Sequence, residues 1–312
     1  MISLFRETTI GYIASVFVIV VGFIVFVRQS SSSTMIILLT LLGLFLIFLS
    51  GKILLTIALK KIGRIEKLLT DDCNAKAYAE IFEKFAKLRQ FGSMKNYVFL
   101  SLANAHLHLG NYQEAISALG RAGKIPNNKL KLPHQFLYHR LLFSYSLRAL
   151  GDISLAKDEL DEMHRILMHP KWKEKQKKQP EKVFAIAECL LRMEQGDYDG
   201  CEAVFKQAEE TAETLLEKVS AKFNLGRIFL HDDRVDEAVE AFTFVALNGG
   251  NLLIQQLAMQ QLELFEQTIE IPLTQQCEIY TPNILTPRTE LIFYICLSIF
   301  LLLSFIIMTT IF

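Results

Sequence analysis

The feature that most constrains this chain is a pair of small residues held twelve positions apart inside apolar stretches with a helical period. In residues 96–126 the pair is Ala103 and Ala115, and a turn at Gly110 separates them. Leu119, four positions after the second small residue, continues the apolar face. Two short amphipathic helices that touch through their small residues account for this pattern. The stretch therefore predicts a helical hairpin.

The same pattern occurs three more times along the chain. The small pairs, in chain order, are Ala103 and Ala115, Ser144 and Ala156, Cys189 and Cys201, and Gly226 and Ala238. The large residues that follow are Leu119, Leu160, Phe205 and Phe242, and the turns begin at Gly110, Gly151, Gly196 and Asp233. One such hairpin cannot bury its apolar face alone, so four in a row predict an all-α stack.

This pattern resembles the tetratricopeptide repeat (TPR), in which L-G-x2-Y is followed by A-x3-F and then P over about 34 residues. The fourth copy carries the first motif nearly intact, as Leu225-Gly226-x2-Phe229. The resemblance implies a solenoid of four repeats, at about residues 96–129, 137–170, 182–214 and 219–250. The turns lie 41, 45 and 37 residues apart, which predicts longer helices or insertions. Glu188 and Arg192 depart from the motif in the third copy.

Segments of helical character flank the repeats. Residues 61–95 are expected to form N-terminal capping helices, with Tyr78 and Phe82 on one apolar face. Residues 251–270 suit a C-terminal capping helix. Residues 271–289 hold three prolines and little periodicity, which predicts an extended linker.

Three long apolar stretches predict transmembrane helices, because each approaches the ~20 residues that cross a hydrocarbon core. Two of them, at about residues 9–27 and 35–56, would form a hairpin within residues 1–60, and the third covers residues 290–312. A cleaved signal peptide is the alternative for the first stretch, and a buried capping helix is the alternative for the third.

The basic residues beside these stretches predict the orientation. Lys60, Lys61, Arg64 and Lys67 follow the second stretch. The positive-inside rule then places the repeats in the cytosol and the serine-rich link between the first two spans outside. We expect an integral protein of a bacterial plasma membrane. A mitochondrial or peroxisomal membrane is the alternative.

Residues 169–180 contain five lysines between two prolines. A solvated loop between repeats is one interpretation. The other is a basic patch in which Trp172 anchors at an interface and the lysines meet anionic lipid or an acidic partner.

The sequence contains few signals for a catalytic, cofactor or metal site. Phosphate-binding, dinucleotide-binding and nucleophile-elbow motifs are absent from the sequence, and the balanced charge argues against nucleic acid. His106 with His108, and His164 with His169, are poorly spaced for metal binding. Cys189 and Cys201 would lie close together, either as a redox pair or as small packing residues. We expect no cofactor, no metal and no catalysis.

Binding is the function that remains. In the TPR family the first helices of successive repeats line a concave groove for a peptide or partner helix. By position, the resemblance implies a groove with Tyr97, Leu100, Asn104, His108, Tyr138, Leu141, Tyr145, Arg148, Phe223, Arg227 and His231. Tyrosine and arginine are common binding anchors. Packing between repeats is the alternative for several of these residues.

In the family's carboxylate clamp, Asn104 matches one position, but Leu100 and Leu142 occupy those of a lysine and an asparagine, so we expect no binding to chaperone C-terminal tails. The sequence therefore predicts a membrane-anchored scaffold or adaptor whose partner it does not name. The alternative is an accessory subunit of a membrane enzyme, transport or secretion complex, with the spans taking part directly.

Overall fold

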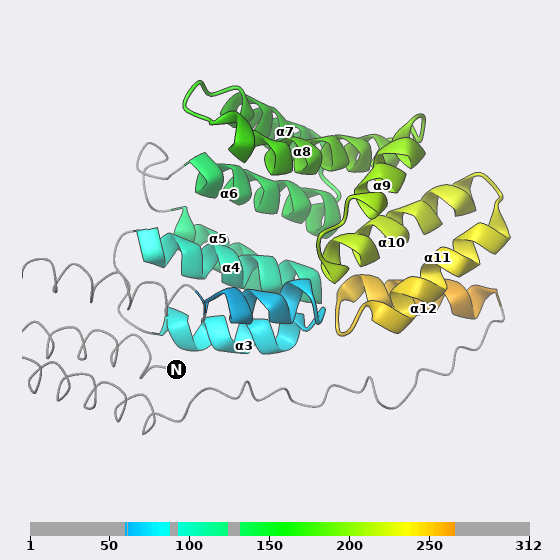
Figure 1. The fold of residues 1–312 in the computed structure, drawn as a ribbon, viewed down its shortest axis with the longest axis horizontal. Coiled ribbons are helices and arrows are strands. Elements are labelled where there is room, and N and C mark those ends of the chain that lie inside the picture. The colour runs from blue at the N-terminus through cyan, green and yellow to red at the C-terminus, as the bar shows by residue number, and fades with distance from the viewer. Residues whose placement is uncertain (1–59, 61, 88–92, 124–131, 266–312) are drawn as a thin grey trace, which may run out of the picture. The chain divides into compact units, whose positions relative to one another are not determined.

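A computed structural model describes residues 60, 62–87, 93–123 and 132–265 (Figure 1). The three predicted membrane spans and the linker at residues 271–289 lie outside these residues. By its contacts the chain divides into two units, Met1–Arg64 with Tyr280–Phe312, and Ile65–Ile279. The second unit is the one described below. Within the described ranges, no helix combines the length and the apolar character that a membrane crossing needs.

Every regular element in the described part of the chain is a helix, which confirms the all-α prediction there. Residues 62–70 are helical and lead into the repeats. The helices that follow are α3 (Ala75–Ala86), α4 (Ser93–Leu109), α5 (Tyr112–Ala122), α6 (Leu132–Tyr145), the π-helical turn η2 (Ser146–Leu150), α7 (Ile153–Leu167), α8 (Glu174–Glu194), α9 (Cys201–Glu210), α10 (Leu215–His231), α11 (Val235–Asn248) and α12 (Leu253–Leu264).

The small residues of the sequence pattern lie where paired helices meet. Each twelve-residue pair places one member on the first helix of a hairpin and one on the second, in α4 and α5, α6 and α7, α8 and α9, and α10 and α11. Ala103, Ala115 and Ala238 are fully buried. At Gly226 a Cβ atom would lie 2.8 Å from a ring carbon of Phe242, so this helix pair needs glycine. The close approach of the two backbones explains the spacing.

The turns inside the four hairpins share one backbone geometry. Gly110, Gly151, Gly196 and Asp233 all have positive φ, between 58° and 81°. The next residue donates its N–H back across the helix end, as from Arg234 to the Phe229 carbonyl at 2.8 Å. This is the hydrogen bond of a Schellman motif, which favours glycine at the left-handed position. Asp233 fills that position without the freedom of glycine.

Only the first part of the lysine-rich segment, residues 169–173, is a loop between repeats. Helix α8 begins at Glu174 and includes Pro180, so most of these lysines belong to its first turns. Pro180 is the seventh residue of α8, beyond the first turn, so it removes one backbone hydrogen bond from the helix. Trp172 is buried, and its indole N–H donates to the Ile166 carbonyl at 2.8 Å. The interpretation of Trp172 as an interfacial anchor is therefore wrong.

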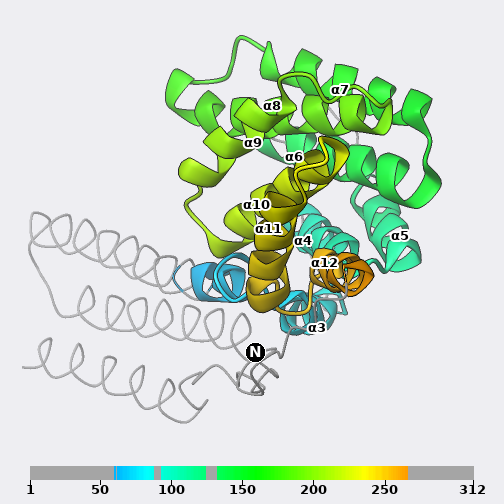
Figure 2. The same ribbon diagram turned by 90° about the vertical axis from the view of Figure 1, so that its right-hand side faces the viewer.

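The two ends of the repeat unit contact each other (Figures 1 and 2). The Asn251 side chain donates to Asn74 Oδ1 at 2.8 Å and accepts from the backbone N–H of Lys76 at 3.3 Å. Gly250 packs closely against the backbone just before α3, since a Cβ atom at this position would lie 2.5 Å from the Cys73 carbonyl oxygen. Helix α12 also contacts α4. The flanking helices thus close the unit on itself.

Candidate functional site

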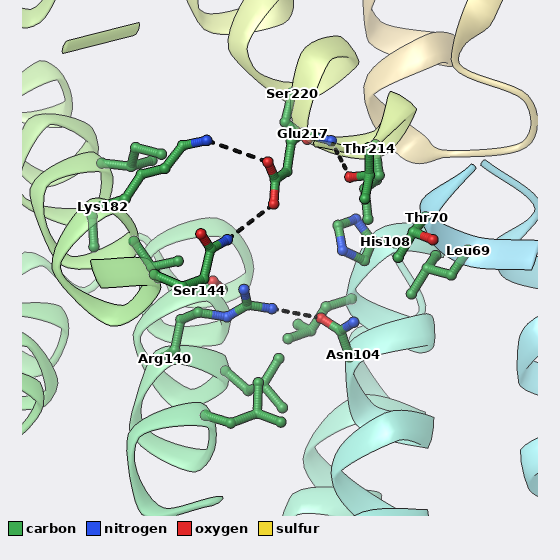
Figure 3. Close-up of a pocket in the computed structure, with 18 of the residues that line it drawn as sticks. Leu69, Thr70, Asn104, His108, Arg140, Ser144, Lys182, Thr214, Glu217 and Ser220 are labelled. Atoms are coloured by element: carbon green, nitrogen blue, oxygen red, sulfur yellow. Dashed lines mark hydrogen bonds and ion pairs between the residues drawn. The ribbon is translucent and has the colours of Figure 1, made fainter. Parts of the chain in front are cut away.

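A cavity of about 430 Å³ lies inside the repeat unit, between the first helices of the hairpins (Figure 3). Helices α4, α6, α8 and α10 supply most of its walls, and α3, η2, α9 and the end of the helix at residues 62–70 supply the rest. Apolar side chains line much of it, including Leu69, Leu107, Leu137, Leu141, Val183 and Leu190. The volume falls in the range of small-ligand sites.

Two arginines of the second hairpin enter this cavity. Arg140 on α6 donates from Nη2 to Asn104 Oδ1 on α4 at 2.9 Å, and Figure 3 shows this contact. Arg148 lies eight residues later, in the π-helical turn that widens the end of the helix. Turns of this kind occur often at functional sites. Arg148 forms no hydrogen bond or ion pair with any residue that the structure describes.

Enclosure by the cavity walls disfavours the charges of both guanidinium groups. Desolvation, the largest cause, lowers the pKa of Arg140 and of Arg148, and the charge of Arg148 lowers that of Arg140 further. Arg148 is nevertheless exposed to solvent, whereas Arg140 is half-buried, so desolvation disfavours the charge of Arg148 less than that of Arg140. Both groups stay protonated at neutral pH, because arginine is effectively always charged in proteins.

The main carboxylate on the opposite wall is already engaged. Glu217 on α10 accepts from Lys182 Nζ at 3.3 Å and from Gln179 Nε2 at 3.0 Å, both on α8 (Figure 3). It also accepts from the backbone N–H of Glu213 at 3.1 Å. Glu217 and Lys182 therefore pair with each other. The charges of Glu217 and Glu194 favour the charged forms of Arg140 and Arg148, respectively, but neither arginine forms an ion pair with a carboxylate in the described part of the chain.

Two more groups complete the polar lining. His108 on α4 is half-buried, and desolvation followed by the charges of Arg148 and Arg140 lowers its pKa to about 3. It is neutral near pH 7. The Tyr97 hydroxyl donates to Glu66 Oε1 at 2.7 Å, and burial, the largest cause, raises the pKa of that hydroxyl. The positive charge of the cavity is thus concentrated at Arg140 and Arg148.

The structure brings part of the predicted groove together. Five of the eleven positions line the cavity, namely Tyr97, Asn104, His108, Leu141 and Arg148. Leu100 is buried, and the Tyr138 hydroxyl packs against Gly123. Phe223 packs edge-on to Phe242, Arg227 pairs with Glu194 at 2.7 Å, and His231 stacks on Tyr198. Tyr145 is half-buried and, like these, does not line the cavity.

Sequence reasoning missed Arg140, Lys182 and Glu217. A signal for Arg140 exists, because Arg140, Ser144 and Arg148 follow one another at four-residue intervals on one face of a helix. Lys182 and Glu217 lie 35 residues apart in the chain, and only the packing of α8 on α10 brings them together. Cys189 and Cys201 are both buried and free, and Cys201 Sγ lies 3.8 Å from the Cys189 carbonyl oxygen.

No group of three or more histidine, cysteine, aspartate or glutamate side chains that could hold a metal ion occurs within the described ranges. A second hollow, between Gly196 and Asp232, is lined by four acidic residues among others, but Asp197 there already pairs with Arg192 at 2.7 Å. The interior cavity is therefore the stronger candidate for a ligand site.

The tetratricopeptide repeat family model matches residues 187–243, which run from the second half of α8 into α11. Searches of the curated proteins and of the solved structures found no match to the chain.

Proposed function

We propose that this chain, whose residues 187–243 match the tetratricopeptide repeat family model, is a membrane-anchored scaffold or adaptor that binds partner proteins through its helical repeats, without catalysis. Repeats of this family indicate a role in protein–protein interaction. A stack of helical hairpins builds an extended surface from side chains of several repeats, and such surfaces are typical binding platforms.

The observation that carries the binding proposal is the interior cavity. Its lining combines apolar side chains with two arginines that have no carboxylate partner among the described residues. Apolar walls with a few convergent polar groups are typical of ligand sites. A partner segment that enters from outside would supply the missing negative charge.

The sequence supports the membrane anchor. The stretches at about residues 9–27, 35–56 and 290–312 are long and apolar, and basic residues follow the second one. We place the repeats in the cytosol of a bacterium, beneath the plasma membrane. Protease protection of an epitope tag tests this orientation. A tag inserted between Ser31 and Ser32 should be digested in intact cells, and a tag at residue 171 should be protected; the opposite pattern contradicts the orientation.

Crosslinking in native membranes tests the scaffold role. The full-length chain would be crosslinked and purified beside a cavity variant, Asn104→Ala with Arg148→Ala, and a control, Arg165→Ala, on the outer surface. We expect partner proteins that crosslink to wild type and to the control, and that are lost from the cavity variant. An identical set from all three chains would refute binding through the cavity.

The second candidate function is an accessory subunit of a membrane enzyme, transport or secretion complex. The length of chain in the three apolar stretches favours it, because spans can take part directly in such complexes. Replacing each stretch with an unrelated span distinguishes the two. A scaffold keeps its partners after this exchange, and an intramembrane subunit loses them.

A further inference from the structure

We propose that Arg140 and Arg148 form a binding site for a single carboxylate side chain, presented beside an apolar side chain on a short segment of a partner protein. This inference deepens the proposed function and rests on it. The two guanidinium groups would bind the carboxylate and give the specificity, and the leucine-rich walls would contact the apolar side chain.

The first argument is charge. The other cation that lines the cavity, Lys182, pairs with Glu217, and Lys222 and Arg227 on α10 pair with Glu209 and Glu194. Glu66 accepts from the Tyr97 hydroxyl. Arg140 has only the neutral amide oxygen of Asn104, and Arg148 has no partner in the described part of the chain. A carboxylate completes this set, since guanidinium groups bind carboxylates through paired hydrogen bonds.

The second argument is space. The cavity offers about 430 Å³, a volume in the range of sites for small ligands. The contacts of Asn251 with Asn74 and Lys76 hold the ends of the unit together and oppose widening. The occupant is therefore short and compact.

The third argument is the position of the residues. Leu100 and Leu142 stand where the family's carboxylate clamp has its lysine and second asparagine. The arginines here come instead from one helix and the π-helical turn that follows it, eight residues apart. This arrangement is distinct from that clamp.

Equilibrium dialysis of the purified full-length chain in detergent tests the site. The probes are two capped dipeptides, one with leucine followed by glutamate and one with leucine followed by glutamine. They have the same shape and differ by one charge. We expect the glutamate probe to bind about tenfold tighter or better, because hydrogen bonds to charged groups are stronger than neutral ones.

The variant Arg140→Gln with Arg148→Gln should lose this preference. The control Arg165→Gln should keep it, because Arg165 pairs with Glu162 on the exposed face of α7. Fluorescence of Trp172, the single tryptophan, reports whether each variant is folded. If the double variant is unfolded, the single variant Arg148→Gln, at a solvent-accessible side chain, must show the reduced preference.

Equal binding of the two probes to wild type would overturn the proposal, and so would a preference that survives in the folded variant. The dialysis needs no partner protein, so its result is separate from the crosslinking. A glutamate preference without any crosslinked partner would refute the scaffold and retain the site. Crosslinked partners without a glutamate preference would refute the site and retain the scaffold.

Discussion

Replacement of His108 by glutamine should make the repeat unit less sensitive to acid. The pKa of His108 is lowered from 6.5 to about 3 by desolvation and by Arg148 and Arg140. Its pKa in the folded chain is thus below the unfolded value, so the unfolded state binds more protons between pH 6.5 and pH 3. Stability therefore falls as the pH drops through this window.

The size of the effect follows from the unfolded pKa. At pH 5 the protonation of an unfolded histidine favours unfolding by about 2 kcal/mol relative to pH 8. His108→Gln removes this contribution, and the remaining pH dependence belongs to other groups. The free energy of unfolding of the variant should thus fall by about 2 kcal/mol less than that of wild type between pH 8 and pH 5.

Urea unfolding followed by Trp172 fluorescence measures this difference. The indole is buried beside α7 and α8, so its emission reports on the repeat unit. Ser144→Ala is the matched control, because it changes a cavity-lining side chain without removing a titratable group. Parallel pH profiles for wild type and His108→Gln would refute the reasoning, since they would mean that His108 titrates alike in both states.

Three substitutions test the packing of the repeats. Gly226→Ala should lower the free energy of unfolding by about 1–3 kcal/mol through overpacking against a phenylalanine of α11, whereas Gly120→Ala, in a helix with open space around it, should raise it by roughly 0.5–1 kcal/mol. Asp233→Gly should raise it by about 0.5–1 kcal/mol, because glycine relieves the positive φ of 58°; an unchanged urea midpoint would contradict this. Asn251→Ala should lower the free energy of unfolding by about 1–2 kcal/mol and speed hydrogen exchange at the start of α3. The control Asn248→Ala should leave that exchange unchanged, because the Asn248 side chain donates to a carbonyl of its own helix.

The repeat geometry was predictable because it depends on local spacing. The twelve-residue interval between small residues is set by two helices and a tight turn, and all eight small positions fall on the expected helices. The same holds for Asp233, which takes the left-handed position that glycine fills in the other three turns. In both cases the residues that interact lie close together in the sequence.

The closure of the unit and part of the cavity were not predictable in this way. Asn74 and Asn251 are 177 residues apart, and neither belongs to a periodic pattern. Lysines between two prolines suggest a loop, but the helix of α8 extends through Pro180 and buries Trp172 beneath its start. Tyr138 suits a binding anchor by residue type, but its hydroxyl packs against Gly123. These outcomes depend on tertiary packing, which local spacing does not encode.

Pairing of the helices within each hairpin does not depend on the two arginines of the cavity, although Arg140 donates to Asn104 between α6 and α4. Helix pairing here depends on small residues and buried phenylalanines, such as Phe205 and Phe242. Enclosing a charge without an opposite charge costs free energy, and replacing it with a neutral side chain avoids that cost. The charge of Arg148 nevertheless disfavours the charge of Arg140, and both arginines lie in one cavity with His108, whose pKa is lowered by desolvation and then by the two arginines. A local arrangement that opposes stability, in a fold that is otherwise consistent, is best explained by a ligand that supplies the missing charge.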